Sequence, residues 1–169
     1  LADDLLHSDE EDPHEMAVFA ATLRSRRAVI LQQRGFLDQA LTLFKKSFSV
    51  LALTDEHAEV ARMQVGMGIC YFRLGSLEKA EELYSDGMST FRRIGNDLGL
   101  ANVMNNLAIL HKNRCAWDEA LHVAEQAVEL SKRIGASHLL TMLHLNQGIV
   151  LQKIGRFGEA RTVLERGLR

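Results

Sequence analysis

The side chains best suited to binding chemistry in this chain are a set of cations, aliphatic groups and amides. The cations are Arg26, Arg62, Arg73, Lys112 and Lys153. Four β-branched residues recur every 40 positions, at Val29, Ile69, Ile109 and Ile149, and three asparagines accompany them, Asn102, Asn105 and Asn146. Cations pair with carboxylates, and amides both donate and accept hydrogen bonds. Together these groups suit a peptide that carries acidic residues.

Metal and catalytic chemistry find less support. His111 and Cys115 are four residues apart and His122 follows, which gives at most three ligands where a structural zinc site uses four. The glycines of the run 66–68 lie within a helical pattern and lack the rest of a phosphate-binding motif. No nucleophile and base stand at a recognisable spacing. We therefore expect no metal, no cofactor and no enzymatic activity.

Small residues recur through the whole chain at a spacing of 40. One column consists of Ala40, Ala80, Ala120 and Ala160, a second of Ala28, Gly68, Ala108 and Gly148, and a third of Ser47, Gly87, Ala127 and Gly167. A fixed period of this length is typical of a solenoid, in which each unit packs on its neighbours. Small side chains let helix axes approach closely, so we expect these columns to lie where the two helices of a unit meet.

The composition favours an all-α protein. Proline occurs once, at Pro13, and strong helix formers dominate the remaining sequence. We expect a first helix at about 14–33, 56–73, 97–113 and 137–153, each followed by a second at about 37–53, 77–94, 117–134 and 157–168. Gly35, Gly75 and Gly155 mark the turns within three units, and Cys115 stands at the equivalent place in the third unit.

The charge distribution separates a short first segment from the repeats. The net charge is −2, yet residues 1–20 hold seven acidic and no basic residues, so that the rest of the chain carries +5. We expect an acidic segment at 1–13 and units at about 14–54, 55–95, 96–135 and 136–169. This weak and scattered positive charge does not favour direct nucleic-acid binding.

Several features bear on the setting of the domain. The chain has two cysteines, Cys70 and Cys115, at different repeat positions, which favours free thiols in a reducing, cytoplasmic compartment. No run of 18 apolar residues occurs, so we expect no membrane span. The sequence does not begin with Met and stops within its last unit, and we expect it to be a fragment of a larger protein.

The repeat pattern resembles the tetratricopeptide repeat family. The second unit carries the matching positions Gly68, Tyr71, Gly75, Leu77, Ala80, Tyr84 and Gly87, and the third carries Leu107, Ala108, Trp117, Ala120 and Ala127. The unit here has 40 residues rather than the family's usual 34. It therefore resembles the long-repeat branch, which includes kinesin light chain, the Pins/LGN polarity scaffold and MalT-type regulators. The resemblance implies a right-handed superhelical solenoid of four helix-turn-helix units, about eight helices.

The resemblance also implies a concave groove, lined by the first helix of each unit, that binds a peptide or a partner helix. The candidate groove residues are Arg26, Val29, Arg62, Ile69, Arg73, Asn102, Asn105, Ile109, Lys112, Asn146, Ile149 and Lys153. Each class has a structural alternative. The β-branched stripe suits interhelical packing, the cations suit solvated surface, and the asparagines suit bridges between helices. The polar residues do not match the arrangement with which some members hold a C-terminal carboxylate.

The sequence therefore predicts a protein-interaction scaffold within a larger signalling or transcriptional regulator. The partner is a protein or peptide, with acidic residues if the cations take part. One alternative is self-association into homo-oligomers through apolar surface at the last helix, with Val163, Leu164 and Leu168 as candidates. Another is a regulatory sensor domain for a small peptide or metabolite.

Overall fold

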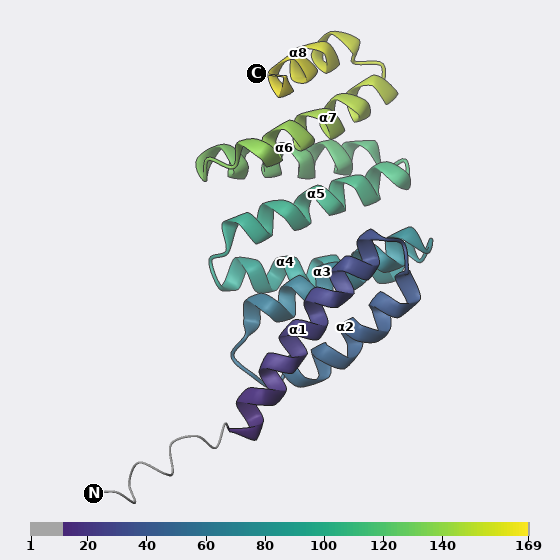
Figure 1. Ribbon diagram of the computed structural model, residues 1–169. Coiled ribbons are helices and arrows are strands. Elements are labelled where there is room, and N and C mark those ends of the chain that lie inside the picture. Colours follow the sequence, from purple (N-terminus) through teal and green to yellow (C-terminus); the bar gives the residue numbers. More distant parts are fainter. Residues whose placement is uncertain (1–11, 169) are drawn as a thin grey trace, which may run out of the picture.

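The chain folds into consecutive pairs of antiparallel helices (Figure 1). The structure is a computed structural model that describes residues 12–168. Within that range the helices are α1 (Pro13–Gln33), α2 (Leu37–Leu51), α3 (His57–Arg73), α4 (Leu77–Arg93), α5 (Asp97–Asn113), α6 (Trp117–Arg133), α7 (Ser137–Lys153) and α8 (Phe157–Gly167). The all-α expectation and the four helix pairs are confirmed. Most of the acidic segment expected at 1–13 lies outside the described residues.

The first helix begins one residue earlier than expected. Asp12 caps α1, because its Oδ1 accepts a hydrogen bond of 2.9 Å from the backbone N–H of His14. Pro13 occupies the first helical position, where its missing N–H leaves no bond unmade and its fixed φ fits the helix. The single proline therefore starts a helix and does not lie ahead of the repeats.

The turns within the pairs share one backbone conformation. Gly35, Gly75 and Gly155 have φ of 90°, 82° and 79°, and Cys115 has the same left-handed conformation with φ of 59°. A residue with a side chain is disfavoured in that region, so Cys115 adopts the conformation of the three glycines at a steric cost that they do not have. Both cysteines are free thiols, Cys70 buried and Cys115 exposed.

The small-residue columns lie at helix contacts, as expected. Ala40, Ala80 and Ala120 are fully buried. A Cβ placed on Gly68 would lie 2.6 Å from the ring of Tyr84 and 3.3 Å from the carbonyl oxygen of Ala80 on the second helix of the same unit. A side chain at position 68 would therefore push α3 and α4 apart.

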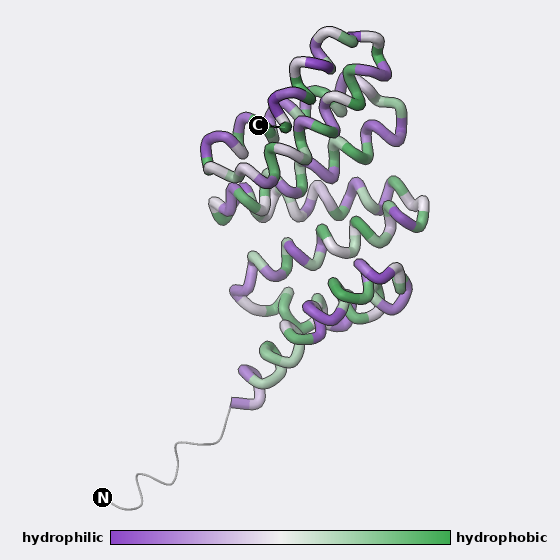
Figure 2. The backbone as a smooth tube through the Cα atoms, turned by 45° about the horizontal axis from the view of Figure 1, so that its top comes forward, coloured by the Kyte–Doolittle hydropathy of each residue, from purple (hydrophilic) through white to green (hydrophobic). Residues whose placement is uncertain are grey.

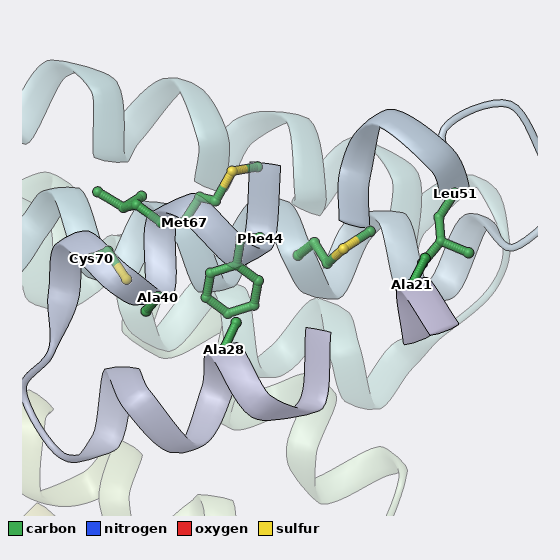
Figure 3. Packing of buried hydrophobic residues seen from close by; sticks show 9 residues of the cluster. Ala21, Ala28, Ala40, Phe44, Leu51, Met67 and Cys70 are labelled. Carbon is green, nitrogen blue, oxygen red and sulfur yellow. The ribbon is translucent and has the colours of Figure 1, made fainter. Parts of the chain in front are cut away.

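The core is a series of clusters, each of which is shared by neighbouring units. In the first, Phe44 of α2 packs among Ala28 of α1 and Met67 and Cys70 of α3 (Figure 3). A Cβ on Gly66 would lie 2.6 Å from that ring, so α3 approaches α2 as closely as it approaches α4. Apolar and polar residues are interspersed along the helices (Figure 2), because each helix contributes residues to these clusters and to the surface.

The helix pairs stack along a curve. The first helices α1, α3, α5 and α7 each contact the next first helix, whereas among residues 12–168 no two successive second helices, α2, α4, α6 or α8, come into contact. A stack whose first helices touch and whose second helices diverge is concave on the first side. We call α1, α3, α5 and α7 the inner helices, the others the outer helices, and the surface of the inner row the inner face.

The last helix exposes less apolar surface than the sequence suggests. Leu168 is 88% exposed, but Val163 is buried against Ala120, Leu121 and Ala160, and Leu164 is half-buried beside Gly148. The expectation that Val163 forms an exposed edge is wrong, because the small residue at position 148 admits α8 deeply onto α7. None of the helices within 12–168 combines the length and apolar character that crossing a membrane requires.

At the junction between α4 and α5, a large residue on one helix packs against a small residue on the next. A Cβ on Gly99 at the start of α5 would lie 2.6 Å from the ring of Phe91, which α4 contributes and which is 3% exposed. Forty residues later the bulk is reversed, with Ser131 and Leu139, both buried. At these two junctions the volume is thus filled once, from one side or the other.

This complementarity predicts coupled effects of substitution. We expect Gly99→Leu to destabilise by about 1–3 kcal/mol through overpacking and Phe91→Ser by about 3–5 kcal/mol through a cavity. The double variant should lose less than the summed amounts, with a coupling of about 1–3 kcal/mol in urea unfolding. Gly158→Leu is the control, because a Cβ there meets nothing within 4 Å. Additive effects of the two substitutions would contradict the exchange.

Candidate functional site

All the candidate residues lie on the inner helices. α1 carries Arg26 and Val29, α3 carries Arg62, Ile69 and Arg73, α5 carries Asn102, Asn105, Ile109 and Lys112, and α7 carries Asn146, Ile149 and Lys153. On α5 the positions 102, 105, 109 and 112 follow the three- and four-residue steps that keep side chains on one side of a helix. The structure gives these residues different surroundings.

Two of the arginines share one carboxylate. Arg26 of α1 pairs with Oε1 of Glu59, and Arg62 of α3 reaches the same oxygen at 2.7 Å. The side chain of Glu59 is 8% exposed, whereas those of Arg26 and Arg62 are 57% and 45% exposed. Glu59, which the sequence pattern did not single out, cancels one of the two charges and bridges α1 to α3. The available signal was an acidic residue in a repeat column that holds no other charged residue.

Arg73 joins α3 to α1 at the opposite end of these helices from Glu59. Its Nη1 donates a hydrogen bond of 2.6 Å to the backbone oxygen of Gln32 in the last turn of α1, where the helix dipole favours a cation. Gln32 is itself buried, and its Nε2 donates to the backbone oxygen of Gly66 and, at 3.4 Å, to Sγ of Cys70. Burial raises the pKa of the Cys70 thiol, which keeps this side chain protonated and inert.

Asparagines and a lysine connect α5 to α7. Nδ2 of Asn146 donates to Oδ1 of Asn105 at 2.9 Å, and Nζ of Lys112 lies 3.4 Å from Oδ1 of Asn146. Asn105 is 4% exposed, whereas Asn146 and Lys112 are half-buried. Burial lowers the pKa of Lys112, because losing water disfavours the charged form. Asn105 thus bridges two helices, and Lys112 remains accessible from the inner face.

The β-branched stripe divides between core and surface. Ile69 is half-buried and packs against the cluster that contains Tyr84 and Leu107. Ile109 and Ile149 are also half-buried, and Val29 is 37% exposed. The inner face is therefore apolar along its length without being sealed into the core.

Asn102 borders a hollow between α3 and α5. Its Nδ2 donates to the backbone oxygen of Leu98 in its own helix at 2.8 Å, and the side chain is exposed. The hollow has a volume of about 300 Å³ and is lined by Arg62, Val65, Phe91, Asn96, Leu98, Gly99 and Asn102. Most of this lining went unnoticed in the sequence. The available signal for the hollow was Gly99, because the same repeat position holds larger side chains in the other units, Phe19, Glu59 and Leu139.

The polar side chains of the inner face are mainly hydrogen-bond donors and cations. Within residues 12–168, no three His, Cys, Asp or Glu side chains gather as a metal ion would need. The face offers guanidinium, ammonium and amide donors next to exposed aliphatic surface. This combination suits a peptide chain with carboxylates.

Comparison with known proteins decides the family. The sequence profile of the tetratricopeptide repeat matches residues 19–93, 59–133 and 99–169. The chain belongs to the tetratricopeptide repeat family. A tetratricopeptide repeat-containing protein of Dictyostelium discoideum is 26% identical over 117 residues, which are 68% of this chain and 7% of that protein.

Solved structures share the tetratricopeptide fold at low identity. BtubC (BKLC) from P. vanneervenii superposes with a TM-score of 0.81 at 20% identity, over 96% of this chain and 66% of that one. Aspartyl phosphate phosphatase F from Bacillus subtilis gives 0.82 at 11% identity, over 94% and 40%. The Rap conjugation gene regulator of plasmid pLS20, in complex with the Phr* peptide, gives 0.75 at 18% identity, over 97% and 44%. The chain thus spans only part of each relative.

The bridge between α5 and α7 predicts a stability cost. Asn105→Ala removes the acceptor for Asn146 and leaves its amide unpaired in a half-buried place, so we expect a loss of about 1–2 kcal/mol. Asn102→Ala is the matched control, because that exposed side chain bonds only its own helix, and its effect should stay within about 0.5 kcal/mol. Urea unfolding measures both. Equal effects would mean that the Asn105 amide does not hold the helices together.

Proposed function

We propose that the inner face binds an extended peptide segment with acidic residues from a partner protein. Tetratricopeptide repeats are interaction modules that act as scaffolds, and one solved relative is a complex with a peptide. The cations, amides and aliphatic side chains of the inner face match the three components of such a segment: its carboxylates, its backbone and its apolar side chains.

The observation that carries this proposal is the state of Lys112. It is half-buried on the inner face, its pKa is lowered by that burial, and its one polar side-chain partner among the described residues is an amide oxygen 3.4 Å away. Arg26 and Arg62, two other cations of the inner helices, are instead paired with the carboxylate of Glu59. A partner carboxylate at Lys112 would restore the favourable charge environment that burial removes.

Two further cations extend this site. Lys153 stands on α7 and is exposed, and Arg73 stands on α3 with its guanidinium bonded to a backbone oxygen. They lie near the ends of their helices, as Lys112 does on α5. An acidic segment that crosses the inner helices there would meet cations in succession, which also accelerates its association.

The proposed setting is a larger regulatory protein, in which this domain recruits a partner. The chain spans 7% of the Dictyostelium relative and less than half of the Rap regulator. These lengths support a role as one part of a longer protein. The identity of the partner then depends on the peptide sequence that the inner face prefers.

A second candidate is self-association through α8. Phe157 and Leu168, near the two ends of α8, are 68% and 88% exposed. A hollow of about 200 Å³ at the Leu168 end is lined by Thr141, Leu145, Leu164, Gly167 and Leu168. Sedimentation velocity at rising concentration distinguishes this candidate. A dimer that Leu168→Lys abolishes would favour it, and a monomer at every concentration would exclude it.

Peptide selection tests the inner face directly. A phage-displayed library of random dodecapeptides is selected against the purified domain, and selected peptides are titrated by fluorescence anisotropy. We expect Lys112→Met with Lys153→Met to weaken binding by about 10- to 100-fold, as the loss of two charge contacts implies. The affinity of the unaltered domain should also fall as salt rises.

The control replaces two exposed lysines of outer helices, Lys46→Met with Lys132→Met. It removes the same charge from the other side of the stack and should leave affinity within about twofold. Equal losses in both pairs would show that only total charge matters, and unchanged binding in the first pair would place the peptide elsewhere. Asn105→Ala is not used for this purpose because it weakens the fold.

A further inference from the structure

The junction between α3 and α5 differs from the other two inner junctions. Glu59 and Arg26 connect α1 to α3, and Asn105 and Asn146 connect α5 to α7. Among the described residues no side-chain hydrogen bond or ion pair joins α3 to α5. The hollow of about 300 Å³ lies at this junction, between Arg62 and Val65 on one side and Gly99 and Asn102 on the other.

The hollow opens on the inner face. Arg62 and Asn102 are 40 residues apart and occupy the same repeat position on adjacent inner helices. The ring of Phe91, from the end of α4, forms the floor where a side chain at position 99 would otherwise lie. Leu98 completes one wall and is itself 55% exposed. A ligand on the inner face therefore passes over an apolar recess at this point.

We infer that this hollow is a side-chain pocket of the peptide groove, which takes one apolar side chain that stands next to a carboxylate. The inference rests on the proposed function and specifies its ligand. The volume is at the lower end of the range of about 300–1,000 Å³ found for small-molecule pockets, so it fits one anchoring side chain rather than a larger compound. Most of its lining is apolar, from Val65, Phe91 and Leu98.

The positive charge at the mouth of the pocket is the reason to expect a carboxylate on the bound peptide. Arg62 is 45% exposed there, and the two guanidinium groups of Arg26 and Arg62 are balanced by the single carboxylate of Glu59. One positive charge therefore remains. The pocket also includes Asn96, the cap of α5, where the helix dipole adds partial positive charge. The carboxylate is that of an acidic side chain next to the anchoring residue, as in the acidic segment proposed above.

The same peptide selection provides the probe. Peptides selected from the dodecapeptide library should share a large apolar residue with an adjacent acidic residue, and one is synthesised as free acid and as C-terminal amide. Equal affinity of the two forms supports a side-chain carboxylate, and loss of affinity in the amide would overturn it. Selected peptides without a shared apolar residue would overturn the pocket.

Two substitutions test the pocket in the folded domain. Asn102→Phe places a ring at the mouth and should weaken the selected peptide by at least about tenfold. Met142→Phe is the matched control, since it makes the same ring at the equivalent position of α7, away from the pocket, and should leave affinity unchanged. Arg62→Gln should reduce affinity for the acidic peptide and remove its advantage over a version with the carboxylate neutralised. Circular dichroism and thermal unfolding verify that each variant folds.

The outcomes separate this inference from the proposed function. Loss of binding in the Lys112 and Lys153 pair with full binding by Asn102→Phe would leave the groove in place and overturn the pocket. No loss in any inner-face variant, or failure to select any peptide, would overturn both. Equal weakening by Asn102→Phe and Met142→Phe would show that a ring anywhere on the inner face blocks the peptide, which also overturns the pocket.

Discussion

The structure depends on how closely its helices can approach one another. At Gly66 and Gly68 of α3, and at Gly99 of α5, an aromatic ring from a neighbouring helix occupies the space of the absent side chain. These approaches set the distance between helices within a unit and between units. Because the inner helices touch and the outer ones do not, they also set the curvature that creates the inner face. The polar bridges and the pocket exist only because this spacing holds the inner helices side by side.

Much of the fold could be predicted from the sequence, because a pattern that recurs four times remains recognisable where one unit departs from it. Helix pairs, turns and small columns recur four times, so an irregular position such as Cys115 is still recognised by its place and is found with the left-handed φ of its sisters. For the same reason the expected first helices coincide with α1, α3, α5 and α7, which carry the candidate residues.

The contacts at the candidate site could not be read in this way, because they arise where the repeat is broken. Glu59 stands where the other units have Phe19, Gly99 and Leu139, and its pairing with arginines from two helices depends on the distance between those helices. The burial of Asn105 depends equally on Asn146 across the junction. One sequence shows that such positions are unusual but not which partner they meet in space.

The inner face thus combines two bridged junctions with one open junction. The bridges hold the inner helices together and leave Lys112 without a carboxylate partner within the described fold, and the open junction leaves an apolar recess beside Arg62. The solved relatives share this architecture at identities too low to transfer a ligand. In the proposed function, the binding preference belongs to the residues that differ between units.

The most direct test of this account maps a selected peptide onto the domain by NMR. Backbone amide shifts of the isotope-labelled protein are followed during titration with the peptide. The account predicts that the largest changes fall on α3, α5 and α7, around Arg62, Asn102, Lys112 and Lys153, with little change in the middle of the outer helices. Changes concentrated on α2, α4 and α6, or on the exposed side of α8, would contradict it.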